Sequence, residues 1–137
     1  MNNKNNIVEN DFIKSREFDF GTIALRHDDI LVFEPSKNIT TVCLKDLKIM
    51  LNGLVELCEN KPKPFFSNNR QLKSLGSEER EFVGRNLHLF ATKTAIIEDS
   101  SIVRFITYMI AHLHKPEIPM KMFKNENEAI QWLKLKD

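Results

Sequence analysis

The chain has 137 residues, of which 42% are hydrophobic and 28% charged, and its formal net charge is +1. This length corresponds most simply to one domain, and the near balance of charges argues against a nucleic-acid partner. Because no apolar run approaches the ~20 residues that span a bilayer, we expect no integral membrane segment and a cytoplasmic protein. Residues 1–11 are predicted to form a disordered tail, and residues 12–137 a single domain.

The first predicted element is a β-hairpin over residues 18–33. Apolar and polar residues alternate along its first half, and Asp28 with Asp29 forms a polar break before the apolar run that ends at Phe33. Two antiparallel strands explain this pattern, and Pro35 ends the second of them.

A helix is predicted next, because apolar residues recur at helical spacing. Thr40 or Thr41 can provide its N-cap, and it stops near Asn60, before Pro62 and Pro64. The stripe expected to face the core consists of Leu44, Leu47, Met50, Leu51, Leu54, Val55 and Cys58.

A short third strand is centred on Phe65 and Phe66, and the polar residues 67–70 follow it. Ser77 is then the expected N-cap of a second helix, whose early glutamates suit the positive end of the helix dipole. We expect Phe82, Val83 and Leu87 to face inward from this helix.

The most regular part of the chain is a strand followed directly by a helix. Thr94–Ile97 forms an apolar, partly β-branched run of strand length, and residues 98–101 favour a turn and a helix N-cap. The helical stripe expected to face inward consists of Ile102, Phe105, Ile106, Met109, Ile110 and Leu113.

The last predicted elements are a strand over Met120–Phe123 and a helix that begins after Asn125. Asn125 with Glu128 three residues later is typical of a capped helix start. The predicted order is therefore β-β-α-β-α-β-α-β-α. It indicates an α/β fold with a mostly parallel five-stranded sheet and an antiparallel N-terminal hairpin.

The element order and two segments resemble the STAS superfamily, the domain of sulfate transporters and anti-sigma-factor antagonists, and especially its small stand-alone bacterial members. The first segment is the turn NNRQLKSL over residues 68–75, and the second is the end MFKNENEAIQWL over residues 122–133. The resemblance covers about Phe18 to Leu135. It implies non-enzymatic work through protein partners, sometimes controlled by phosphorylation, and sometimes binding of a small ligand.

In phosphorylated members of that superfamily, the acceptor serine lies in an Asp-Ser-Ser-Gly type turn at the start of the helix after the third strand. Residues 76–79 occupy this position here, and only Ser77 matches in residue type. The resemblance therefore points to Ser77 as a possible phosphoacceptor. The acid before it and the second serine are missing, and the neighbouring glutamates oppose an added phosphate.

The favoured hypothesis is a non-enzymatic contact module that needs no cofactor or metal and acts as a homodimer or with a partner protein. Its predicted contact or ligand surface follows the third strand, where α/β sheets usually bind. Arg70 can bind a carboxylate or phosphate. The surface consists of Asn68, Asn69, Arg70, Ser74, Ser77 and Glu78.

Two alternatives have less support. A small apolar-ligand or lipid-binding module, like the related CRAL-TRIO fold, would use a pocket lined by Phe105, Met109, Met120 and Met122. A hydrolase would use Asp99, Ser100 and His112, which nothing in the sequence orients together. His88, His112 and His114 lack the spacing of a helical zinc site, so a helix-end role is favoured for the last two.

Overall fold

A computed structural model describes residues 12–136, so the predicted tail over residues 1–11 lies outside the described residues. The strands are β1 (Phe12–Phe18), β2 (Gly21–Arg26), β3 (Leu31–Pro35), β4 (Lys63–Asn68), β5 (Ala91–Ile97) and β6 (Met120–Phe123). The helices are α1 (Leu44–Leu57), α2 (Ser77–Asn86), α3 (Ser101–Met109) and α4 (Glu126–Lys134). A 3-10 turn (Leu87–Leu89) extends α2, and a π-helical turn (Ile110–His114) extends α3.

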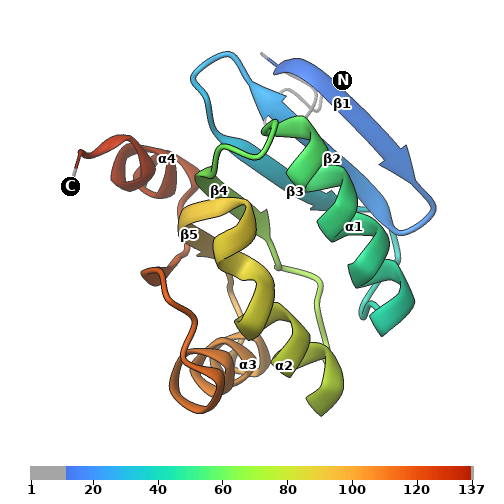
Figure 1. Ribbon diagram of the computed structural model, residues 1–137. Coiled ribbons are helices and arrows are strands. Elements are labelled where there is room, and N and C mark those ends of the chain that lie inside the picture. Colours follow the sequence, from blue (N-terminus) through green and yellow to red (C-terminus); the bar gives the residue numbers. More distant parts are fainter. Residues whose placement is uncertain (1–11, 137) are drawn as a thin grey trace.

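These strands form one six-stranded sheet in the sequential order β1-β2-β3-β4-β5-β6 (Figure 1). β1, β2 and β3 pair antiparallel, while β3 to β6 pair parallel. The predicted α/β class and the mixed sheet are therefore confirmed. The expected five strands become six, because β1 precedes the predicted hairpin.

β1 escaped prediction because it is an edge strand with a mostly polar surface. Its central residues, including Arg16, are exposed, and such charged edges prevent pairing with another chain. Lys14 pairs with Glu59 at 3.2 Å, and Arg16 pairs with Glu56. These ion pairs connect β1 to the end of α1. In the sequence, the charged residues of β1 are typical of a solvent-exposed segment without a strand.

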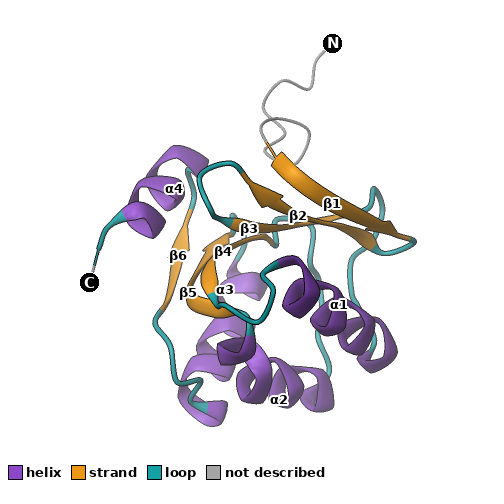
Figure 2. Ribbon diagram, turned by 45° about the horizontal axis from the view of Figure 1, so that its top comes forward, coloured by secondary structure: helices purple, strands orange, loops and turns teal. Residues whose placement is uncertain are grey.

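The helices lie in two layers, one on each side of the sheet (Figure 2). Parallel strands are connected by right-handed crossovers, so a sequential strand order puts α1, α2 and α3 on the same face. α4 covers β4, β5 and β6 on the opposite face. Successive residues of a strand point to opposite faces of the sheet, so both faces have a core. Phe65 packs with α1 on one face, whereas Phe66 packs with α4 on the other.

The helix starts confirm the predicted cap of α4 and correct those of α1 and α2. Asn125 accepts a hydrogen bond from the Glu128 amide at 3.0 Å, as expected for α4. α1 instead starts after Cys43 without a side-chain cap, because the Thr41 hydroxyl donates to the Ser74 carbonyl oxygen. Ser77 is the first residue of α2 and not its N-cap. The N-cap is the preceding glycine, so no side chain caps this helix.

Candidate functional site

The helix α3 exposes large apolar side chains on its outer face. Its inner face is buried through Val103, Ile106 and Ile110. Its outer face exposes four large apolar side chains, including 59% of Phe105 and 55% of Tyr108; the other two are Ile102 and Leu113. The only charged residue within α3, Arg104, is also exposed. Because several large apolar side chains gather on one exposed face, this outer face is a candidate contact surface.

This arrangement corrects the predicted inward stripe of α3. Phe105 was expected in the core but points to solvent, whereas Ile106 and Ile110 are buried as predicted. Because large apolar residues lie on both the inner and the outer face of the helix, their spacing does not indicate which face meets the sheet. The buried Val103 and Thr107 define the true inner face, and the predicted stripe lies across its border.

The two ends of the α3 surface differ in charge. Its N-terminal end follows the exposed Asp99, and the Ser100 hydroxyl oxygen caps the helix by accepting from the Val103 amide at 3.3 Å. The preceding Glu98 is buried and pairs with the exposed Arg104 of α3 at 3.5 Å. The C-terminal end carries His112, His114 and Lys115. The outer surface therefore has the acidic Asp99 at one end and basic residues at the other.

His112 at this end contacts its own helix. His112 stacks on Tyr108, with ring centres 4.0 Å apart, and its Nδ1 lies 3.0 Å from the Tyr108 carbonyl oxygen. This supports the predicted helix-end role of His112. Within residues 12–136, no group of three possible ligand side chains is placed to hold a metal ion.

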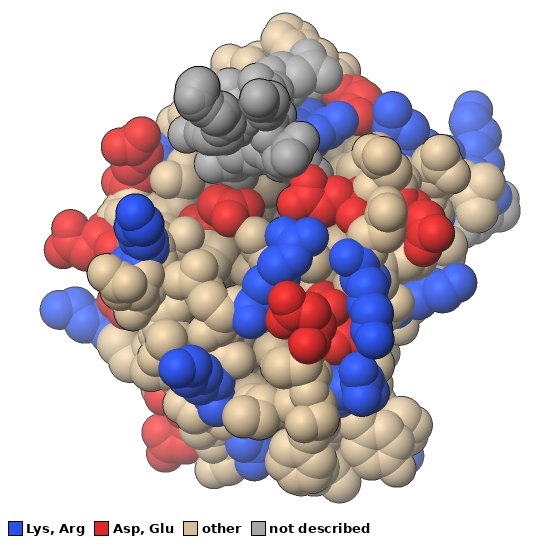
Figure 3. Space-filling model, turned by 180° about the vertical axis from the view of Figure 1, so that it is seen from behind, with Lys and Arg blue, Asp and Glu red and all other residues tan. Residues whose placement is uncertain are grey.

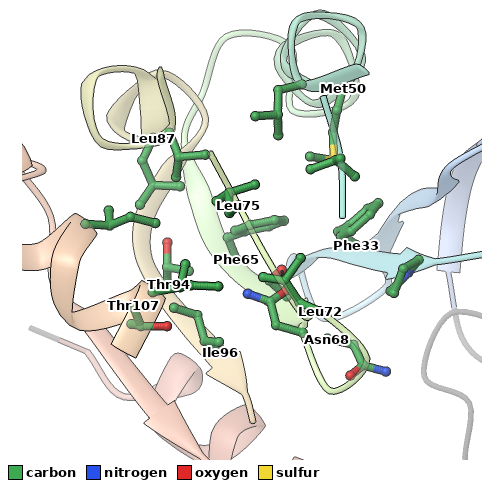
Figure 4. A pocket seen from close by; sticks show the side chains of 18 of the residues that line it. Phe33, Met50, Phe65, Asn68, Leu72, Leu75, Leu87, Thr94, Ile96 and Thr107 are labelled. Carbon is green, nitrogen blue, oxygen red and sulfur yellow. Dashed lines mark hydrogen bonds between the residues drawn. The ribbon is translucent and has the colours of Figure 1, made fainter. Parts of the chain in front are cut away.

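A second feature is an apolar cavity of about 130 Å³ between the sheet and α1, α2 and α3 (Figure 4). Phe65 of β4 and Thr94 of β5 are paired in register on its floor, and Met120 of β6 continues the row. Met50 of α1 and Leu87 of the turn after α2 face them. The loops after β3 and β4 border the cavity, at the carboxyl end of the parallel strands, where α/β proteins bind ligands.

The cavity replaces most of the predicted apolar pocket. Met120 lines it, whereas Phe105, Met109 and Met122 are not among its lining residues. The lining residues contributed by α1 and by the loop after β4 could not be assigned to one cavity from the sequence. Each segment has an ordinary helical or turn pattern, and only the packing reveals the space that they leave.

The predicted surface after β4 is largely engaged within the protein. Asn68 is only 9% exposed, and its amide nitrogen donates to Glu34 at 2.7 Å. Asn69 accepts from the Ser67 hydroxyl, also at 2.7 Å, and Arg70 pairs with Glu126 at 3.0 Å. These three residues hold the loop against the sheet and α4. Their polar groups are therefore less available to a partner than predicted.

The other predicted residues of that surface, Ser74, Ser77 and Glu78, are exposed. The three side chains of the suggested hydrolase are not brought together: Ser100 caps α3, and His112 lies twelve positions later, roughly 18 Å away at helical rise.

Figure 3 shows the opposite side of the molecule, where basic and acidic side chains are interspersed. No helix of the described chain is long and apolar enough to cross a membrane.

These features define an α/β protein with a mixed six-stranded sheet, an exposed apolar helix face and an apolar cavity between the sheet and the helices. A family model described as a domain of unknown function, DUF7793, matches residues 23–136, and the chain belongs to this family. Comparisons with curated proteins and with solved structures found no match.

Proposed function

We propose that this protein is a non-enzymatic contact module that pairs with a second copy of itself through the outer face of α3. The observation that carries the proposal is the exposure of Phe105 and Tyr108 on a helix whose other face is already buried in the core. Exposed aromatic side chains have a large apolar area to bury at an interface and are typical of its centre.

The charges at the ends of this face favour a symmetric pair. In a two-fold arrangement with antiparallel α3 helices, the acidic end near Asp99 meets the basic end near Lys115 of the other copy. Phe105 and Tyr108 then lie near the axis, where both copies contribute the same side chains. Since one helix face buries less than the roughly 800 Å² per partner of a standard interface, we expect a weak, concentration-dependent dimer.

The proposed role agrees with the resemblance to the STAS superfamily, whose members work through protein contacts. Membership of that superfamily is part of the proposal, supported by the element order and by the capped final helix with its Trp132. Ser77 remains the proposed phosphoacceptor of a regulated member, because it is exposed and lies in the first turn of α2.

Sedimentation velocity of the full chain over a wide range of concentrations tests the pairing. The wild-type protein is expected to shift from monomer to dimer, and Phe105→Glu to remain a monomer. Leu135→Glu is the matched control, because it removes an equally exposed apolar side chain far from α3 in the sequence and should dimerise as wild type does. A wild-type protein that stays monomeric, or a Phe105→Glu variant that dimerises equally, would contradict the proposal.

A further inference from the structure

The cavity carries an inference that is independent of the pairing through α3. We propose that it binds a small neutral ligand that contains one apolar ring and one hydrogen-bonding group, and that the Thr94 hydroxyl binds this group. The size of the cavity, the chemistry of its lining and one unpaired polar atom support this assignment.

Its size limits the ligand to about one ring. A cavity of roughly 150 Å³ lined by aliphatic and aromatic side chains accommodates benzene. The volume of about 130 Å³ found here is close to that value and well below the roughly 300–1,000 Å³ of pockets for drug-sized molecules. An extended lipid chain, as in the CRAL-TRIO comparison, does not fit without movement of the helices.

The lining excludes a charged ligand. Among the described residues, all that line the cavity are apolar or carry uncharged hydroxyl or amide groups, and no Asp, Glu, Lys, Arg or His is included. A phosphate, carboxylate or ammonium group would lose its hydration there without an opposite charge to compensate. The ligand is therefore neutral.

One polar atom of the lining has no partner. Four hydroxyl groups line the cavity, and three of them donate to protein oxygens: Thr41 to Ser74, Ser67 to Asn69, and Thr107 to Val103. The hydroxyl of Thr94, a residue only 2% exposed, has no hydrogen-bond partner among residues 12–136. A buried hydroxyl can both donate and accept, so a ligand hydroxyl next to the ring satisfies it.

Binding of phenol, benzene and benzoate to the full chain tests these three points, measured by amide chemical shifts in NMR titrations. We expect phenol to bind more tightly than benzene, and benzoate not to bind. Thr94→Val should weaken phenol roughly fivefold and leave benzene unchanged, because it removes one hydrogen bond and keeps the shape. Thr107→Val is the matched control and should retain the preference for phenol.

A second variant tests the location of the site. Val83→Phe places a larger side chain at the cavity wall and should abolish binding of both phenol and benzene, with circular dichroism verifying that the fold is retained. If that variant does not fold, the nuclear Overhauser contacts of bound phenol with Phe65 and Met120 in the wild-type protein answer the same question. Absence of binding by both phenol and benzene, binding of benzoate as tight as phenol, or an unchanged phenol preference in Thr94→Val would overturn the inference. None of these results depends on whether the protein dimerises through α3.

Discussion

The ammonium group of Lys93 lies against Trp132, donating to its carbonyl oxygen at 2.8 Å and resting 4.9 Å from the centre of its ring. Lys93 also donates to the carbonyl oxygen of Leu135 at 2.9 Å, although it lies in a central strand and is only 4% exposed. It thereby donates to carbonyl groups at the C-terminal end of α4, where a positive charge also complements the helix dipole. This side chain connects the last helix to the sheet, in addition to the core contacts of Ala129 and Leu133.

Lys93→Met tests that connection, because it keeps the apolar stem and removes the ammonium group. We expect the free energy of unfolding to fall by about 2 kcal/mol, since the carbonyl groups of Trp132 and Leu135 lose a charged donor. Lys121→Met is the matched control: its ammonium group also lies over Trp132, at 5.9 Å, but its residue is exposed and should matter little. Urea unfolding of both variants makes the comparison, and equal losses would contradict the assigned role.

Asp28 makes the free energy of unfolding depend on pH in the acidic range. Burial raises the pKa of its carboxyl group, but the hydrogen bonds and charges of Arg26 and Lys134 lower it by more, so its pKa lies below the usual value. The stabilisation is thus present above the unfolded-state pKa of roughly 3.9 and is lost as pH falls through the folded-state value.

Asp28→Asn should accordingly cost about 1 kcal/mol at neutral pH. The difference from wild type should shrink as pH falls below about 4, because the wild-type carboxylate is then protonated as well. Unfolding by urea at several pH values measures this. Asp19→Asn, in an exposed turn, is the control. A difference that stays constant down to the lowest pH would show that the ion pairs with Arg26 and Lys134 do not stabilise the fold.

The unpaired hydroxyl of Thr94 predicts an unusual gain of stability without ligand. Thr94→Val replaces a buried polar group by a methyl group of similar shape, and we expect unfolding to cost about 1 kcal/mol more. Thr107→Val should give no such gain, because its hydroxyl already donates to the Val103 carbonyl oxygen at 2.8 Å. Thermal unfolding of the two variants is the measurement, and a lower melting temperature for Thr94→Val would disagree with its unpaired state.

Two helical glycines differ in what a methyl group would meet. A Cβ atom on Gly84 of α2 would lie 2.5 Å from the Cβ of His114, which is fixed close to the backbone. One on Gly53 of α1 would meet the tip of Ile23 at 2.6 Å, a flexible group that can move. Gly84→Ala should therefore destabilise by about 2 kcal/mol through overpacking.

For Gly53→Ala we expect a smaller loss, since the better helix propensity of alanine offsets part of the contact. Denaturant unfolding of the two variants ranks them. A reversed order would mean that α2 and the turn ending at His114 can separate more easily than their packing indicates.

Much of the fold was predictable where the local sequence pattern is typical of only one structure. The capped start of α4 at Asn125 and the strand Met120–Phe123 were predicted with their observed bounds. β1 was missed because its charges resemble those of a solvated segment. Phe105 is predicted in the core because the large apolar residues of α3 lie on both its inner and its outer face, so their spacing does not identify the inner one.

The candidate site depended on contacts that the sequence does not encode locally. Asn68 is the last residue of β4 and not part of the turn after it, and its amide donates to the distant Glu34. The unpaired hydroxyl of Thr94 is likewise visible only after packing. Lys93 precedes the predicted apolar run Thr94–Ile97, and nothing in its neighbourhood in the sequence distinguishes it. Its role arises from carbonyl groups about forty positions later in the chain.

The central claim is that α3 pairs with α3 of a second copy, and disulfide trapping across the two-fold axis tests it most directly. Tyr108→Cys places a thiol near the proposed axis, in a chain where Cys43 is replaced by serine because it is exposed and could cross-link by itself. Mild oxidation should yield a covalent dimer, whereas the matched Leu135→Cys variant should form no covalent dimer although it still pairs through α3. A Tyr108→Cys protein that forms no covalent dimer, or that cross-links no faster than Leu135→Cys, would contradict the proposed pairing. Turnover of a substrate by the purified protein would separately contradict its non-enzymatic role.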